Sequence, residues 1–322
     1  SAIRAGNAAT PHREARARRL AAAPMIADAY VPIAITDRSG HDESVHFGAA
    51  VAIGPSGDIV LAHGDPQVPV YPRSALKPLQ TDAMLGLGIR LHDRQVALAC
   101  ASHGGSPAHL AVVRSTLADA GLDESALQNT AAWPRDTDEA EALIAGGASA
   151  APLFMYCSGK HAAMVATCVA NGWPVDSYLE IDHPLQRAIT SHVEALGATV
   201  THIGVDGCGA PTHVMPLIDL ANAYRQLAVA RSRPWLAMQT HPELVAGERF
   251  ASTRLMRTVS ELMAKAGAEG AFAAALPDGR AVAVKVADGA DRSLALLRRL
   301  QDGGVAIADF QLRRPTLDDV FL

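Results

Sequence analysis

Two short hairpins near opposite ends of the chain constrain its fold more than any other feature. Residues 47–53 and 59–62 are apolar and flank a turn rich in glycine and proline, and residues 271–276 and 280–286 flank the turn P-D-G. Turns of this kind join antiparallel strands. Most of the chain between the hairpins has a helical pattern. We therefore expect an α+β protein with one antiparallel sheet built from both chain ends and covered by helices.

No linker or internal repeat divides the 322 residues, and 49% of them are hydrophobic, which allows a large core. We expect an N-terminal extension over residues 1–40 that is poorly ordered or helical. A single catalytic domain is expected over residues 41–322, with an atypical tail at residues 291–322. Within the domain, residues 251–267 have a helical pattern.

The net charge and the cysteine content indicate which class of partner the protein binds and in which cellular compartment it works. The net charge of −5 and a pI near 6.2 argue against a nucleic-acid surface, and no apolar run approaches a membrane span. The chain has no secretory signal pattern. Four cysteines are too few and too spread for a disulfide framework: Cys100, Cys157, Cys168 and Cys208. We expect a cytoplasmic protein with reduced thiols and a small-molecule partner, without nucleic acid or membrane.

A serine and a lysine lie three residues apart at an expected helix start, in the segment Y-P-R-S-A-L-K-P-L-Q at residues 71–80. One helical turn separates Ser74 from Lys77, so the two side chains share a face. A helix N-terminus stabilises negative charge, and a neutral lysine can act as the base toward such a serine. The same spacing occurs by chance on many surface helices, so this motif alone leaves both interpretations open.

Two later residues extend this pattern. Ser102 lies on a turn with glycines and a proline, and Lys285 lies in the last expected strand. Penicillin-recognising serine enzymes combine an S-x-x-K helix, a second polar group on a loop and a lysine in a K-T-G motif. The order of Ser74, Lys77, Ser102 and Lys285 agrees with this layout. However, S-H-G replaces S-D-N and V-K-V replaces K-T-G, so a β-lactam substrate is not the natural inference.

Five motifs carry a resemblance to a known family. They are R-S-A-L-K-P-L-Q at 73–80, A-S-H-G-G at 101–105, Y-C-S-G-K-H-A at 156–162, D-H-P-L-Q at 182–186 and G-V-D-G-C-G at 204–209. In this order they resemble the L-asparaginase II family, which comprises the Rhizobium etli-type or class 3 bacterial asparaginases. The resemblance extends from about residue 45 to about residue 290.

The resemblance implies a β-lactamase/glutaminase-like fold, a homodimer and hydrolysis of L-asparagine to L-aspartate and ammonia. It also implies two serine–lysine pairs, Ser74 with Lys77 and Ser102 with Lys285. In this assignment Ser74 is the nucleophile and Lys77 is its base. Ser102 and Lys285 form a second proton relay.

The same resemblance implies a zinc ion close to the substrate, held by residues that correspond to Cys157, Lys160 and Cys208. Two thiolates and a neutral amine leave a fourth position open for water or substrate. No organic cofactor is expected. The sequence alone favours the core for Cys157 and Cys208, so their role as ligands rests on the resemblance, and it also favours the core for Cys100 and Cys168.

Further expectations concern Arg73, His161 and Asp206, which we expect to contact the substrate or support the residues that do. Two alternatives stay open. One is a glutaminase or another amidohydrolase on the same fold, and the other is a non-catalytic protein that binds zinc or an amino acid. Residues 312–322 are more similar to the end of a drug-export ABC transporter ATPase, but the chain has no P-loop motif, so ATPase activity does not follow.

Overall fold

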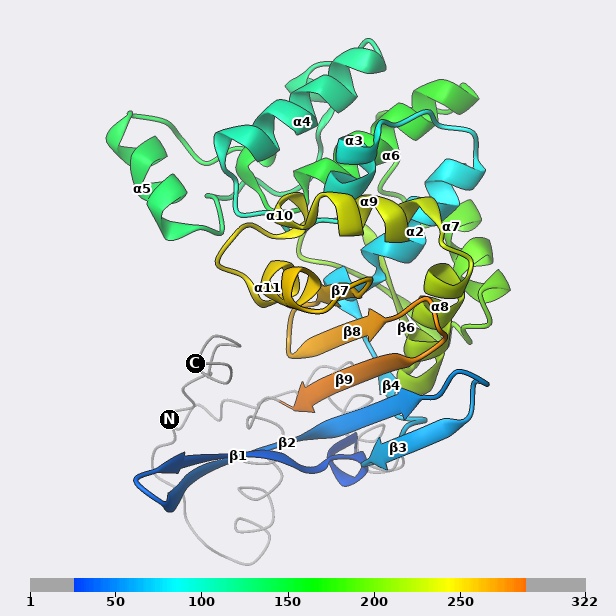
Figure 1. Ribbon diagram of the computed structural model, residues 1–322. Helices are drawn as coiled ribbons and strands as arrows, with labels where there is room; N and C mark the ends of the chain where they lie inside the picture. Colours follow the sequence, from blue (N-terminus) through cyan, green and yellow to red (C-terminus); the bar gives the residue numbers. More distant parts are fainter. Residues whose placement is uncertain (1–25, 288–322) are drawn as a thin grey trace, which may run out of the picture.

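The computed structural model describes residues 26–287 (Figure 1). Its larger sheet is antiparallel with the order β1-β2-β9-β8-β7, and β3 also pairs with β2. A smaller antiparallel sheet has the order β4-β6-β5. The strands are β1 (Val31–Arg38), β2 (His41–Ile53), β3 (Ile59–His63), β4 (Pro69–Val70), β5 (His202–Val205), β6 (Pro211–Pro216), β7 (Met263–Ala266), β8 (Ala271–Ala275) and β9 (Ala281–Ala287).

Helices fill most of the chain between β4 and β7. The α-helices are α2 (Lys77–Gly86), α3 (Asp93–Ala99), α4 (Pro107–Asp119), α5 (Thr137–Ala145), α6 (Ser158–Asn171), α7 (Pro184–Ala195), α8 (Leu217–Val229), α9 (Arg233–Thr240), α10 (Pro242–Val245) and α11 (Ala251–Thr258). Short 3-10 helices are η1 (Ile26–Ala29), η2 (Arg73–Leu76), η3 (Glu124–Ala126) and η4 (Pro152–Phe154). None of the helices within residues 26–287 has the length and apolar character needed to cross a membrane.

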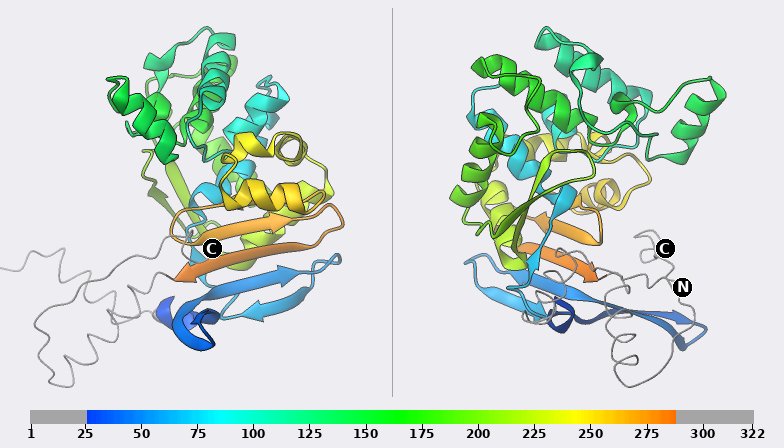
Figure 2. Two further views of the ribbon diagram at one scale, coloured as in Figure 1. Left: turned by 60° about the vertical axis from the view of Figure 1, so that its left-hand side comes forward. Right: turned by 180° about the vertical axis from the view of Figure 1, so that it is seen from behind.

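The larger sheet joins the two ends of the described chain. β2 from the start pairs with β9 from the end, from Phe47 opposite Ala287 to Ile53 opposite Ala281. α8 packs against β2, β8 and β9, and α11 packs against β7. In both views of Figure 2 the helical layers lie together, and the β1-β2-β3 end of the sheet lies farthest from them. The α+β architecture expected from the two hairpins is confirmed.

Two expected boundaries are wrong. The boundary at residue 40 falls inside a hairpin, because residues 31–38 form β1 and pair with β2. The helix expected over residues 251–267 ends at Thr258 and is followed by β7. β7 is buried on both faces, so its sequence M-A-K-A lacks the polar–apolar alternation that marks a half-exposed strand. Residues 1–25 of the expected extension and the tail at 291–322 lie outside the described residues.

α6 is the central helix of the helical layers. All its residues from Ser158 to Cys168 are buried, and it packs against α2, α3, α4 and α7. Gly159 permits a close approach to α3, since a Cβ at Gly159 would lie 2.5 Å from the carbonyl oxygen of Leu98. This contact fixes the first turn of α6 beside the end of α3, from which the chain leads to Ser102.

Candidate active site

Ser74 lies in a tight turn that continues into a helix. The turn is η2, and α2 begins directly after it at Lys77. Arg73 has a φ of +54°, in the left-handed region that residues other than glycine rarely adopt. Such a conformation costs about 1–3 kcal/mol and occurs most often at functional sites. Only 7% of the Ser74 surface is exposed, so the turn is nearly enclosed.

Two buried lysines converge on the hydroxyl of Ser102. Lys77 Nζ donates to Ser102 Oγ at 3.1 Å and also to the carbonyl of Ala101. Lys265 Nζ donates to Ser102 Oγ at 2.9 Å and to the carbonyl of Ala266 at 2.6 Å. Each lysine is 1% exposed. Ser102 therefore bridges two amines in the protein interior.

The environment of Lys265 favours a neutral amine. Burial lowers the pKa of Lys265 well below its ordinary value of 10.5, and the positive charges of Lys77 and Arg135 lower it further. Two ammonium groups at one hydroxyl repel each other. The arrangement around Ser102 is therefore more stable when one of the two lysines is neutral. A neutral amine in hydrogen-bond contact with a serine can accept its proton. The Lys77–Ser102–Lys265 cluster is therefore suited to proton transfer.

The lysine that we expected beside Ser102 lies elsewhere. Lys285 is half-buried on β9, where its amine donates to the carbonyl of Glu269. β8 separates β9 from β7, the strand that carries Lys265. The structure therefore corrects the assignment: the lysine in contact with Ser102 is Lys265 and not Lys285.

A sequence signal for this lysine exists at residues 265–267. The segment K-A-G differs by one residue from the K-T-G motif of penicillin-recognising enzymes. The helical pattern assigned to residues 251–267 concealed it, because K-T-G belongs on a strand. The valine alternation around Lys285 correctly indicated a strand of the larger sheet, but this strand is β9, and the lysine in contact with Ser102 is on β7.

Lys77 follows Ser74 by one helical turn, as expected. The hydrogen bonds found for its amine within residues 26–287 nevertheless go to Ala101 and Ser102. The ring of Tyr156 lies beside the amine, with its centroid 5.9 Å from Lys77 Nζ. Lys77 is thus held between the turn of Ser74 and the loop of Ser102.

Two cysteines and a lysine form a second buried cluster. Cys157 precedes α6 and Cys208 lies on the loop between β5 and β6, and both contact Met155 and Ala210 in a small cluster separate from the main core. Lys160 Nζ donates to Cys208 Sγ at 3.3 Å. None of the three side chains is more than 2% exposed. Their convergence agrees with the expected ligand set.

The charges in this cluster are coupled. The Cys157 thiol lowers the pKa of Cys208 by hydrogen bonding, and the Lys160 ammonium lowers it further. Burial raises the pKa of Cys157. For Lys160, burial opposes the charged amine, but the two cysteines outweigh it and raise the pKa. These directions favour a Cys208 thiolate beside a Lys160 ammonium, whereas a lysine that binds a metal ion must be neutral.

The donor set fits a zinc ion. Two thiols and one amine are soft and borderline donors of the kind that zinc takes, and they converge in a buried place. The part of the chain that the structure describes has no cluster of three His, Cys, Asp or Glu side chains arranged for a metal, and the third donor here is a lysine. His161 is a buried neighbour of this set and interacts with Cys208.

His161 is neutral and fixed by its neighbours. Its Nδ1 lies 2.8 Å from the hydroxyl of Tyr178. Burial lowers the pKa of His161 to about 4, and the Cys208 thiol, which interacts with the ring, raises it only in part. His161 thus supports the loop of Cys208.

Arg73 and Asp206 form an ion pair next to Ser74. Arg73 Nη2 lies 2.7 Å and its Nε 2.8 Å from Asp206 Oδ1, and both side chains are partly buried. Burial opposes the charge of Arg73, but Asp206 outweighs it, and the pKa of Arg73 is raised. The Asp206 carboxylate also accepts from the amide of Gly207. The pair places a fixed guanidinium one residue from Ser74.

Cys100 and Cys168 belong to the main hydrophobic core, as expected. Burial raises the pKa of Cys100 to about 12 and that of Cys168 to about 11. All four cysteines have free thiols.

The loop that carries Ser102 is anchored to two elements. The amide of Ser102 donates to the carbonyl of Val245 at 2.9 Å, and the amide of His103 donates to that of Tyr156 at 3.2 Å. His103 Nε2 also lies 2.9 Å from Ser158 Oγ at the start of α6. These bonds connect Ser102 with the cysteine–lysine cluster.

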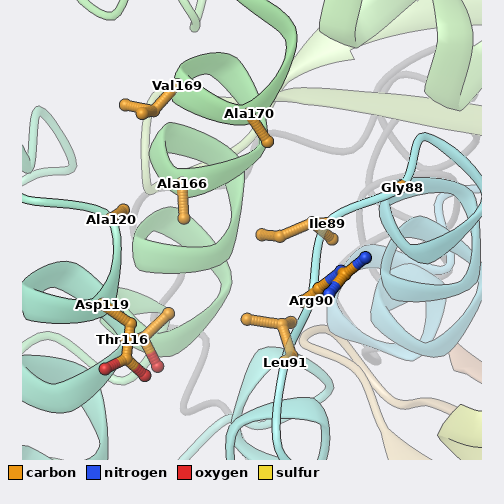
Figure 3. Close-up of a pocket in the computed structure, with 10 residues that line it drawn as sticks. All are labelled: Gly88, Ile89, Arg90, Leu91, Thr116, Asp119, Ala120, Ala166, Val169 and Ala170. Carbon is orange, nitrogen blue, oxygen red and sulfur yellow. The ribbon is translucent and has the colours of Figure 1, made fainter.

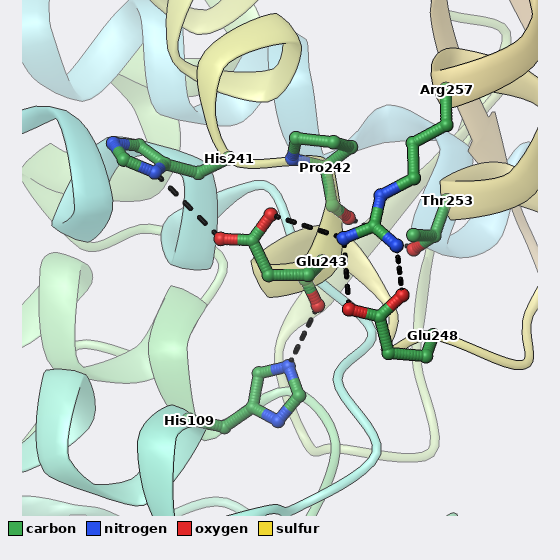
Figure 4. A network of polar contacts seen from close by, with 7 residues as sticks. All are labelled: His109, His241, Pro242, Glu243, Glu248, Thr253 and Arg257. Carbon is green, nitrogen blue, oxygen red and sulfur yellow. Dashed lines mark hydrogen bonds and ion pairs between the residues drawn. The ribbon is translucent and has the colours of Figure 1, made fainter.

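α10, which ends at Val245, is itself held by polar contacts (Figure 4). His109 Nε2 donates to the carbonyl of Glu243 at 3.1 Å. Arg257 of α11 pairs with Glu248, with Nη2 2.8 Å from Oε1, and lies 3.9 Å from the Glu243 carboxylate. This network holds α10, whose last residue, Val245, accepts the hydrogen bond from the Ser102 amide.

Two cavities among residues 26–287 lie outside the serine–lysine site. One of about 370 Å³ lies between α4, α6 and the loop after α2, with Arg90 and Asp119 among apolar side chains (Figure 3). The other, of about 260 Å³, is lined by Gly104 and by side chains that include four carboxylates: Asp136, Glu139, Glu243 and Glu248. Neither cavity is lined by the serines or lysines described above.

Comparison with known proteins gives one family. Residues 34–307 match the family model described as L-asparaginase II, a range that contains all the site residues named above. No curated protein sequence matches the chain.

Several solved structures are distantly similar. A structure described as a β-lactamase from Mycobacterium bovis is 17% identical, with 80% of this chain and 93% of that chain covered and a TM-score of 0.33. Mglu in its native form is 16% identical, with 81% and 66% covered and a TM-score of 0.34. SurE is 17% identical, with 84% and 74% covered and a TM-score of 0.34.

Proposed function

Because the chain belongs to the L-asparaginase II family, a family of amidohydrolases with amino-acid substrates, we propose that it hydrolyses the side-chain amide of L-asparagine to L-aspartate and ammonia. The observation that carries this proposal is the Lys77–Ser102–Lys265 cluster beside Ser74. Amide hydrolysis needs a nucleophile, a base that activates it and an acid that protonates the departing nitrogen. The two serines and two buried lysines can supply all three.

In the first half of the reaction, Ser74 Oγ attacks the side-chain amide carbon of the substrate. Its proton moves into the Lys77–Ser102–Lys265 cluster, where the Lys265 amine, whose pKa is lowered by burial, is the candidate acceptor. The amide oxygen becomes negatively charged, and the backbone N–H of Ser74 at the start of the helical turn is a candidate donor to it. Transfer of a proton to the amide nitrogen then breaks the C–N bond, which releases ammonia and leaves an acyl ester on Ser74.

In the second half, water attacks the ester carbon and gives a proton to a lysine amine. The C–O bond to Ser74 breaks, Ser74 Oγ takes back a proton and L-aspartate leaves. The hydroxyl of Ser102 can pass protons between Lys77 and Lys265, because it lies 3.1 Å from one amine and 2.9 Å from the other. Burial lowers the pKa of Lys265 well below its ordinary value, which favours the neutral amine that can accept a proton.

Substrate charge has a partner in Arg73. We assign its guanidinium, held by Asp206, to the carboxylate of the amino acid, because Arg73 lies one residue from the nucleophile. Cys157, Lys160 and Cys208 would hold the zinc ion that the family resemblance implies. When bound, zinc supplies a positive charge and a Lewis acid beside the substrate. A homodimer and a cytoplasmic location remain predictions.

The test is an ammonia-release assay with L-asparagine and L-glutamine as substrates. Wild type is expected to prefer asparagine, and Ser74→Ala is expected to lose turnover by at least about 10⁴-fold. Equal and negligible turnover of both proteins would contradict enzymatic activity, and faster release from glutamine would contradict the substrate.

Ser102 is the competing nucleophile, since both lysines contact it. Rapid quenching during asparagine turnover and peptide mapping by mass spectrometry would locate the acyl group. We expect it on Ser74, also in the Ser102→Ala variant. An acyl group on Ser102 would exchange the roles of the two serines.

A further inference from the structure

Gly267 brings the end of β7 against the turn that carries Ser74. Gly267 is buried and follows Lys265 by two residues. A Cβ on Gly267 would overlap the carbonyl oxygen of Pro72 and lie 3.1 Å from the backbone nitrogen of Ala75. The Ala75 amide donates a hydrogen bond of 3.0 Å to the Pro72 carbonyl, and this bond closes the turn around Ser74. Backbone atoms in a closed turn cannot rotate away as a side chain can.

The end of β7 is also held from its other sides. The amide of Gly267 donates to the carbonyl of Ala271 at 2.7 Å. The amide of Ala266 donates to Ser252 Oγ at 3.0 Å, and the side chain of Lys265 reaches Ser102. Contacts on all sides leave the added methyl group no space without a shift of β7 or of the turn.

We propose that Gly267, because it has no side chain, lets β7 pack closely against the Ser74 turn. Gly267 is thus a positioning residue for the contact between Lys265 and Ser102. The role rests on the proposed amide hydrolysis for its effect on turnover, but its effect on Lys265 can be measured without turnover. A shift of about 1 Å between reacting groups can cost about a hundredfold in rate.

A glycine with the same steric restriction lies elsewhere in the same sheet. A Cβ on Gly48 of β2 would overlap the carbonyl oxygen of Lys285 and lie 2.5 Å from Ile33 Cδ1. The three atoms nearest to this added Cβ belong to Lys285, Ile33 and Val286, none of which is in the serine–lysine site. Gly48→Ala is therefore a matched control that strains the sheet without moving Lys265.

The charge of Lys265 reports its position. Burial keeps its amine neutral, and the groups that act on it are Lys77 of α2, Arg135, Cys100 and Cys157. The two cations lower the pKa of Lys265 and the two cysteines raise it. If β7 moves outward, the amine gains contact with water and moves away from Lys77, so its pKa rises toward the ordinary value.

The experiment compares the full-length wild type, Gly267→Ala and Gly48→Ala. The rate of Lys265 acetylation by acetic anhydride is measured against pH by mass spectrometry, and kcat and KM are measured for asparagine at a temperature at which each protein is folded. For Gly267→Ala we expect a Lys265 titration at higher pH and a kcat about tenfold to a hundredfold lower, with KM changed less than about threefold. Gly48→Ala is expected to keep the wild-type titration and kcat.

The proposal is overturned if Lys265 titrates as in wild type in Gly267→Ala, or if both variants shift it equally. If wild type releases no ammonia, the proposed function fails, and the acetylation profiles still decide the role of Gly267. If Gly267→Ala does not fold, Ser252→Ala replaces it, since this variant loosens the end of β7 without adding an atom. An unchanged Lys265 titration in Ser252→Ala would then overturn the proposal.

Discussion

Lys265 and Ser102 lie 163 residues apart in the chain and are joined by a hydrogen bond of 2.9 Å in the protein interior. Lys77 approaches the same hydroxyl at 3.1 Å from a helix one turn beyond Ser74. The second amine gives the Ser-x-x-Lys motif a proton acceptor that the motif does not itself contain. Ser102 therefore connects the two lysines, and it does not act with one lysine only.

Removal of the Lys265 amine is expected to abolish most of the activity. Lys265→Met keeps the length of the side chain and should lower kcat for asparagine by about 10²–10⁴-fold, the range of general acid–base catalysis. Lys285→Met removes a lysine of the same sheet and should change kcat less than about threefold. Steady-state kinetics of both variants check this. An equal loss of kcat in both would show that Lys285 also takes part in the reaction.

Stability should depend on pH through the same amine. In the unfolded chain Lys265 has its ordinary pKa near 10.5, and in the folded protein its pKa is much lower. Between the two values the unfolded state binds one more proton, so the free energy of unfolding falls as the pH decreases from 10.5, by about 1.4 kcal/mol per unit in this window.

Lys265→Met lacks this contribution, while all other titrating groups are shared. The free energy of unfolding of wild type should therefore increase relative to that of the variant as the pH rises toward 10.5. Urea unfolding of both proteins at several pH values measures the difference. A difference that does not change with pH would show that Lys265 is protonated in the folded state.

Zinc retention should depend on Cys208. Cys208→Ala is expected to lose at least about tenfold in zinc affinity, because it removes one of two thiolates from the set with Cys157 and Lys160. Cys168→Ala truncates another buried cysteine of the core and should retain the metal. Zinc content per chain after dialysis against a weak chelator distinguishes them, and equal content would exclude Cys208 as a ligand.

Arg73 combines a strained backbone with a binding side chain. Arg73→Gly should relieve the left-handed conformation, which offsets part of the stability that is lost with the Asp206 ion pair. Without the guanidinium, KM for asparagine should rise by at least about tenfold. Arg73→Lys should have an intermediate KM, because lysine lacks the planar fork. A wild-type KM in Arg73→Gly would remove Arg73 from substrate binding.

The features that were predicted from sequence depend on short-range geometry. Ser74 and Lys77 are related by one helical turn, so local spacing was enough to pair them, whereas the grouping of Cys157 with Lys160 rested on the resemblance to the family. The hairpins β2–β3 and β8–β9 were identified because their turns contain glycine, proline and aspartate.

Lys265 was missed for a physical reason. Its strand has four residues, is buried on both faces and is joined to the rest of the site by pairings distant in sequence. Neither periodicity nor turn chemistry reports such a strand. β1 was missed for a related reason, since it combines Pro32 with a bulged register and shows no regular alternation.

The position of β7 in the sheet also determines when the site can form. Within the described part of the chain, β7 pairs with β8 alone, β8 pairs also with β9, and β9 pairs also with β2. Contacts between residues so far apart in the chain form late in folding, and during synthesis β7, β8 and β9 leave the ribosome after the segments that carry Ser74, Lys77 and Ser102. A nascent chain therefore carries Ser74, Lys77 and Ser102 before the second amine, and the Lys77–Ser102–Lys265 cluster is complete only when β7 has joined the sheet.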